Sequence, residues 1–131
     1  MAEDETFETT AEHFAMFEEE VALWIERFGL KSWQLFIEHV DCGDLGTRAR
    51  VHWSLGQRQA KIKLNKVCNS AASETNVRVA AFHEVCELFF SDLTSELWLT
   101  RSDAFVDALT HGLIRTLENV VWWPDWKARK R

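Results

Sequence analysis

The segment Ala80–Phe90 constrains this chain more than any other stretch, because it is apolar on nearly every side when it is drawn as a helix. A helix of this kind lies at the centre of a protein, with no face left for solvent. Three polar side chains interrupt it, namely His83, Glu84 and Glu87. Because buried carboxylates and imidazoles are costly without partners, these groups need hydrogen bonds, opposite charges or a metal ion.

The spacing of these polar residues points to metal chemistry. His83 and Glu87 are at positions i and i+4, so a helix places them one turn apart on one face, where both can bind one ion. A catalytic Zn²⁺ takes about three protein ligands and keeps one position open for water. We expect the third ligand from the next helix, with His111 as the first choice and Asp107 as the second. Glu84 points to another side and is the expected general base, which takes a proton from the activated water and passes it to the leaving amine.

A hydrogen-bonded His–Glu pair explains the same residues without a metal, with His111 as a core histidine whose hydrogen bonds are satisfied. The motif H-E-x-x-E alone is a weak signal, because both residue types are common on helices. Its position on the most apolar helix of the chain, followed by a histidine on the next helix, favours the metal site. Cys86 is expected to be a small buried hydrophobic residue and not a ligand.

The chain has 131 residues, which is enough for one domain with one core. We expect that domain to span 1–131, with a loose acidic N-terminus over 1–8 and a Trp-rich basic tail over 122–131. The tail contains Trp122-Trp123-Pro124-Asp125-Trp126, which either forms an exposed apolar patch that binds a partner or folds back over the closing helix.

The fold class predicted for this domain is α+β, because strands are followed by helices. The first helix is expected to begin with a capping box of Thr9 and Glu12. Ser73 and Ser102 are the expected caps of the two later helices, and Pro124 is expected to end regular structure. The helices would pack on one face of a small three-stranded antiparallel sheet. The predicted elements, in chain order, are a helix over 10–28, strands over 32–40, 47–55 and 58–64, a central helix over 74–91, an irregular connection over 91–100 and a closing helix over 103–121.

Charge and cysteine usage restrict the class of protein. The net charge of -6 argues against a general nucleic-acid-binding surface, although one strand face and the C-terminal tail are basic. Three cysteines without a CxxC pair suit a reducing compartment. The N-terminus has no hydrophobic signal region, and no apolar run reaches membrane-spanning length. We therefore expect a cytoplasmic protein whose substrate or partner is a protein or peptide, and not a membrane or nucleic acid. The basic strand residues are Arg48, Arg50, Lys61 and Lys63.

The chain resembles the small metallopeptidases encoded by phages and prophages, a minimal zincin group that is distantly similar to SprT-like proteins. The resemblance spans about 28–121 and implies bound Zn²⁺. Carried over to this sequence, it makes His83 a zinc ligand, Glu84 the general base and His111 a ligand from the downstream helix. Glu87 stands where the family has a second histidine. The segments that carry the resemblance are Phe28-Gly29-Leu30-Lys31-Ser32-Trp33, Ala60-Lys61-Ile62-Lys63-Leu64-Asn65-Lys66, Ala81-Phe82-His83-Glu84-Val85-Cys86-Glu87-Leu88 and His111-Gly112-Leu113-Ile114-Arg115-Thr116-Leu117.

The resemblance implies a phage-type zinc-dependent metallopeptidase that hydrolyses peptide bonds in the cytoplasm of a bacterial host. An extended peptide substrate would pair with the strand beside the cleft, which is either 47–55 or 58–64. Glu87 adds negative charge, which weakens the metal as a Lewis acid and suits a harder divalent ion than zinc. The alternative is a catalytically inactive zincin-like protein that acts as a binding, adaptor or inhibitor module.

Overall fold

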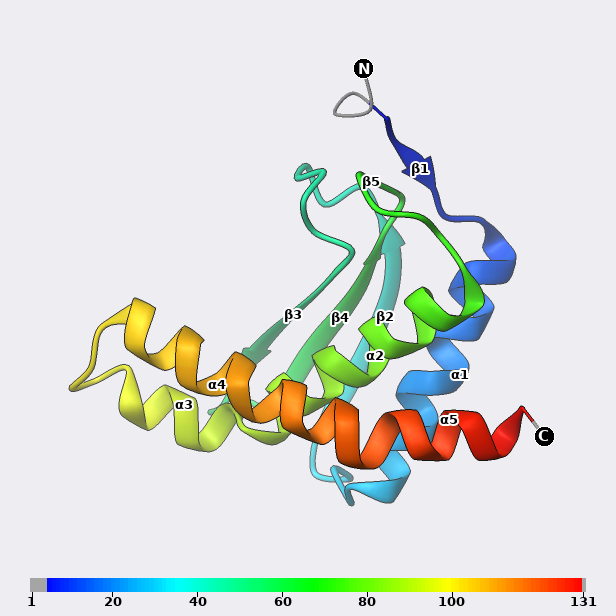
Figure 1. Cartoon of the computed structure of the whole chain (residues 1–131). Helices are drawn as coiled ribbons and strands as arrows, with labels where there is room; N and C mark the ends of the chain where they lie inside the picture. The colour runs from blue at the N-terminus through cyan, green and yellow to red at the C-terminus, as the bar shows by residue number, and fades with distance from the viewer. Residues whose placement is uncertain (1–4, 131) are drawn as a thin grey trace.

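The computed structural model describes residues 5–130 and shows helices packed against a small sheet (Figure 1). The α+β class is therefore confirmed. None of the helices within 5–130 is long and apolar enough to cross a membrane. The elements, in chain order, are β1 (Phe7–Glu8), α1 (Ala11–Arg27), β2 (Gln34–Val40), β3 (Ala49–Ser54), β4 (Gln59–Asn65), β5 (Val67–Cys68), α2 (Glu74–Phe89), α3 (Ser91–Leu97), α4 (Asp103–Leu117), a π-helical segment (Glu118–Trp122) and α5 (Trp123–Arg129).

The main sheet has the strand order β2-β4-β3, with β4 in the centre. Strands β3 and β4 form the predicted antiparallel hairpin, but β2 pairs with β4 in parallel. The prediction of a purely antiparallel sheet is therefore wrong. Each strand reverses the direction of the one before it, so β2 and β4 run the same way. The connection from β2 to β3 crosses over the position of β4. Strand β4 therefore lies between β2 and β3, and β3 lies at an edge of the sheet.

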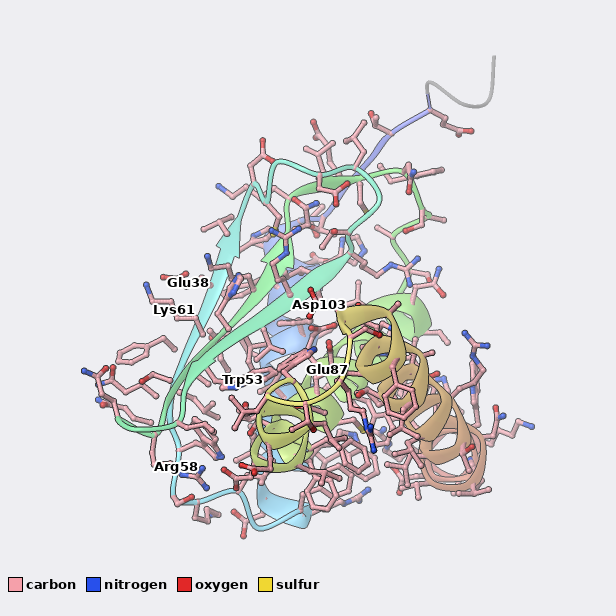
Figure 2. The ribbon with its side chains drawn as sticks, turned by 90° about the vertical axis from the view of Figure 1, so that its left-hand side faces the viewer. Glu38, Trp53, Arg58, Lys61, Glu87 and Asp103 are labelled. Carbon is pink, nitrogen blue, oxygen red and sulfur yellow. The ribbon has the colours of Figure 1, made fainter. Side chains whose placement is uncertain are left out.

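The sheet buries one face and exposes the other, as the alternation of its residues predicts. Ile62 of β4 is fully buried, and its partners Val51 and Ile37 lie on the same inner face. Figure 2 shows Glu38 and Lys61 on the outer side of the sheet, away from the helices. Helices α1 and α2 contribute to the same core cluster as the inner face of the sheet.

The N-terminal part of α1 differs from the prediction by one residue. Thr10 caps the helix, and it forms a capping box with His13 instead of the predicted box of Thr9 and Glu12. Thr9 is engaged elsewhere, because its hydroxyl donates to the carbonyl oxygen of Asn65 at 2.8 Å. The predicted loose N-terminus is also wrong for β1, which pairs with β5, whereas residues 1–4 lie outside the described part of the chain.

The second half of the chain is more helical than predicted. Ser73 and Ser102 cap α2 and α4 as expected. The connection expected to be irregular contains α3, which begins at Ser91. Pro124 does not end regular structure, because it lies in the first turn of α5, directly after the π-helical segment. Figure 1 shows α4 and α5 as one long helical run that crosses α2.

The C-terminal tryptophans belong to the core. Trp122 is fully buried and Trp126 is 7% exposed, so of the two expected arrangements of the tail the structure has the one that folds back, and not the exposed patch. The indole N–H of Trp122 donates to the carboxylate of Glu20 at 3.0 Å, across a long stretch of sequence. The tail therefore folds back over the helices and completes the core.

Glu20 is a fully buried carboxylate that joins three parts of the fold. It accepts hydrogen bonds from Trp24 of α1 at 2.7 Å, from Trp122 at 3.0 Å and from Arg78 of α2 at 3.1 Å. Arg129 of α5 donates two more, at 2.9 and 2.7 Å. Burial alone would raise the pKa of Glu20, but these donors outweigh it and lower the pKa below its ordinary value.

We expect Glu20→Gln to lower the free energy of unfolding by about 3 kcal/mol near neutral pH, because it removes one partner of a buried ion pair. Since its folded-state pKa is lowered, ionised Glu20 stabilises the fold above its ordinary pKa of 4.5, and this stabilisation is lost as the pH falls through the folded-state value. The difference in the free energy of unfolding between the wild type and Glu20→Gln should therefore become smaller as the pH falls. Urea unfolding at several pH values measures it.

The matched control is Glu18→Gln, which makes the same change on an exposed residue of α1. It should change stability by less than about 0.5 kcal/mol. Equal effects of the two substitutions would contradict the structural role assigned to Glu20.

Candidate metal centre

Helix α2 carries three of the candidate residues at one wall of a cleft. Its core side is held by Phe82, Val85 and Cys86, which are fully buried. This packing fixes the backbone, so His83 and Glu87 project from the remaining side, where both are partly exposed. Cys86 is the buried hydrophobic residue that the sequence predicts.

Helix α4 brings His111 to the same place. Val106, Thr110 and Ile114 are buried and recur at helical spacing, so this side of α4 packs against the domain. His111, next to Thr110, remains exposed and faces the His83 ring, with 5.4 Å between ring centroids and an interplanar angle of 31°.

The potential ligand atoms of His83, Glu87 and His111 lie within 4.8 Å of one another. His83 Nε2 and Glu87 Oε2 are 3.7 Å apart. Ligand atoms at about 2.1 Å from a tetrahedral ion are separated by about 3.4 Å. If side-chain rotations moved these ligand atoms by roughly an ångström, the three residues could therefore surround one ion. The donor set of two imidazoles and one carboxylate is one that zinc uses in catalytic sites.

Asp107, the second choice for the third ligand, is an exposed residue one turn before His111 on α4. The ligand group found among the described residues consists of His83, Glu87 and His111, without Asp107. The geometry thus favours the first choice.

Glu118 is a candidate residue that the sequence analysis missed. Its Oε2 lies 3.4 Å from Nδ1 of His83, whereas Nε2 of the same ring faces Glu87. Histidine ligands commonly donate their second ring N–H to a carboxylate, which fixes the tautomer and the ring orientation. Glu118 opens the π-helical segment after α4, and segments of this kind are frequent at functional sites. The sequence shows that Glu118 follows His111 by about two helical turns. This spacing does not predict a contact with His83 unless the π-helical segment is known.

Glu84 differs from the other carboxylates of the cleft because it is buried, with 6% of its surface exposed. Burial raises the pKa of its carboxyl well above the ordinary value, and the charge and hydrogen bonding of Glu87 raise it further. The positive charge of Arg50 acts in the opposite direction. Glu84 therefore has a higher affinity for a proton than an ordinary glutamate, which suits a group that must accept a proton and return it.

A cleft of about 480 Å³ gives access to these residues. The loop that forms part of its rim is held by the buried side chain of Asn65, which donates to the carbonyl oxygens of Asp44 and Thr47 at 3.0 and 2.7 Å. The cleft therefore has a fixed wall on the sheet side and a wall of ionisable groups on the helical side. Its lining residues are Gly46, Thr47, Arg48 and Ala49 from the sheet side, and Val79, Ala80, His83, Glu84, Glu87, His111 and Glu118 from the helical side.

We expect Glu118→Gln to weaken zinc binding by about tenfold, because it replaces the carboxylate that accepts from the His83 ring with a neutral amide. Competition with a zinc-binding dye measures the affinity. Asp107→Asn is the matched control, since it removes one negative charge from an exposed residue on α4, and it should leave the affinity within about twofold. A larger loss for Asp107→Asn than for His111→Ala would instead make Asp107 the third ligand.

Comparison of the chain with known protein families, with curated proteins and with solved structures gives no significant match. The interpretation of this cleft therefore rests on the positions of its own side chains. Those positions bring an imidazole and a carboxylate from α2 and an imidazole from α4 within reach of one ion, beside a buried carboxyl group.

Proposed function

We propose that this protein is a zinc-dependent peptidase that hydrolyses a peptide bond in the cleft between β3 and α2. The observation that carries the proposal is the convergence of His83, Glu87 and His111, whose ligand atoms lie within 4.8 Å of one another. The combination with a buried carboxyl at Glu84 is the arrangement that metal-assisted hydrolysis needs.

His83, Glu87 and His111 would hold the ion, and their chemistry fits a divalent metal. When bound, such an ion acts as a Lewis acid that polarises the scissile carbonyl and acidifies a water molecule. Glu87 supplies a negative charge where a third imidazole would be neutral, so this site binds harder ions better than an all-histidine site does. Zinc is the first candidate, and another divalent ion is the second.

Glu84 is proposed as the general base. It would accept a proton from the attacking water and later donate that proton to the amine that leaves. Because burial raises its pKa, Glu84 holds a proton more tightly than an ordinary glutamate does, which suits a group that takes a proton and later passes it on. Glu118 would hold the imidazole of His83 through Nδ1, so that Nε2 points toward Glu87 and His111.

The position of β3 supports a peptide as the substrate. Of the two strands that were candidates for pairing with a substrate, β4 is central and β3 lies at the edge of the sheet. Ala49, the first residue of β3, also lines the cleft. An extended peptide that added to this edge would form backbone hydrogen bonds and pass beside the ionisable residues of α2.

Metal content and turnover test the proposal in two steps. Protein purified without a His-tag should contain about one zinc per chain, and His83→Ala should lose it, since three ligands are the usual minimum for such a site. With a library of quenched fluorescent peptides, Glu84→Gln should lower the cleavage rate by about a hundredfold or more while the zinc content is unchanged. Loss of zinc in Glu84→Gln would contradict its role as the base.

A second candidate function is a zincin-like binding module without turnover. Exposed apolar side chains on α4 support it, because such patches commonly bind other proteins. These side chains are Phe105, Leu109 and Leu113. Zinc binding without cleavage of any library peptide would favour this candidate.

A further inference from the structure

Arg48 is a cleft residue that the proposed mechanism does not use. It lines the same cleft as His83, Glu84 and His111, on the sheet side. Its Nε is shielded from solvent and has no hydrogen-bond partner within the described residues. A buried donor without an acceptor is unfavourable, and a guanidinium is best satisfied by a planar carboxylate that accepts two hydrogen bonds.

The neighbouring arginine, Arg50, differs from Arg48 because it has partners within the chain. Arg50 donates to the hydroxyl of Thr47 at 3.3 Å and lies 3.8 Å from the carboxylate of Asp44. Arg50 is also the arginine whose charge opposes the raised pKa of Glu84. Arg48 has neither role among the described residues, so no carboxylate of these residues offsets its charge where it lines the cleft.

The charges of the cleft are divided between its two walls. Glu84, Glu87 and Glu118 come from the helical side, where a bound cation would offset them. Arg48 comes from the sheet side, beside the start of the edge strand. A substrate that carries a carboxylate can therefore meet a positive charge on one wall while its scissile bond faces the other.

We propose that Arg48 is a specificity-determining residue that binds a carboxylate of the peptide substrate, which makes acidic peptides or peptide C-termini the preferred substrate class. This inference rests on the proposed function, because it concerns the same cleft. The carboxylate comes either from an acidic side chain near the scissile bond or from the free C-terminus. Both sources offer the same planar, bidentate acceptor to the guanidinium.

Three hydroxamate-capped dipeptides test this inference on the zinc-loaded protein. Each carries the same malonyl hydroxamate, which binds the metal. The first ends in Ala-Glu-amide and offers an acidic side chain, the second ends in Ala-Gln with a free C-terminus, and the third ends in Ala-Gln-amide and is neutral. Dissociation constants are measured by calorimetry for the wild type, for Arg48→Gln and for the matched control Arg50→Gln, which removes the same charge two residues away.

In the wild type, at least one carboxylate probe should bind about tenfold more tightly than the neutral probe, as expected for a hydrogen bond between charged groups. The probe that gains this advantage identifies the source of the carboxylate. Arg48→Gln should abolish the preference with unchanged zinc content, and Arg50→Gln should retain it.

Equal binding of all three probes to the wild type, or a preference that survives in Arg48→Gln, would overturn the inference while leaving the metal centre intact. A wild-type protein that takes up no zinc would overturn the proposed function together with this inference. The zinc content of the wild type separates these two results.

Discussion

The buried carboxylate of Glu20 is the interaction on which the rest of the structure depends. A charge with no solvent exposure is tolerable only if donors surround it, and these donors come from α1, α2, the π-helical segment and α5. Trp122, one of the donors, closes the π-helical segment, and Glu118 opens it. The same segment is therefore fixed at one end by the core and contacts His83 at the other. Core packing and site geometry are linked through these few residues.

The site combines a rigid support with groups that keep some freedom. The fully buried residues of α2 fix its backbone, and Asn65 fixes the loop on the opposite side of the cleft. His111 is exposed on α4, so its ring can rotate toward an ion without disturbing the core. A ligand group that is preformed but slightly open would let the proposed ion bind with small side-chain movements.

The parts of the structure that sequence patterns predict are those set by local spacing. The start of α2 follows from its Ser73 cap, and the one-turn separation of His83 and Glu87 follows from helical geometry. The parallel pairing of β2 does not, because it depends on which side of the hairpin the strand joins. The burial of Trp122 depends on a carboxylate in α1, and the contact of Glu118 depends on a π-helical turn. Neither is visible in a short window of sequence.

At the two carboxyl groups of Glu84 and Glu87, a proton and the proposed metal ion would compete for the same negative charge. Burial, together with repulsion by the charge of Glu87, raises the pKa of Glu84. A divalent cation held by Glu87 and the two histidines would supply a counter-charge and would lower the affinity of Glu84 for a proton. The repulsion between the two carboxyl groups would thus favour the uptake of a cation. Arg48 lies on the other wall, so the proposed contact with a substrate carboxylate would not depend on this exchange.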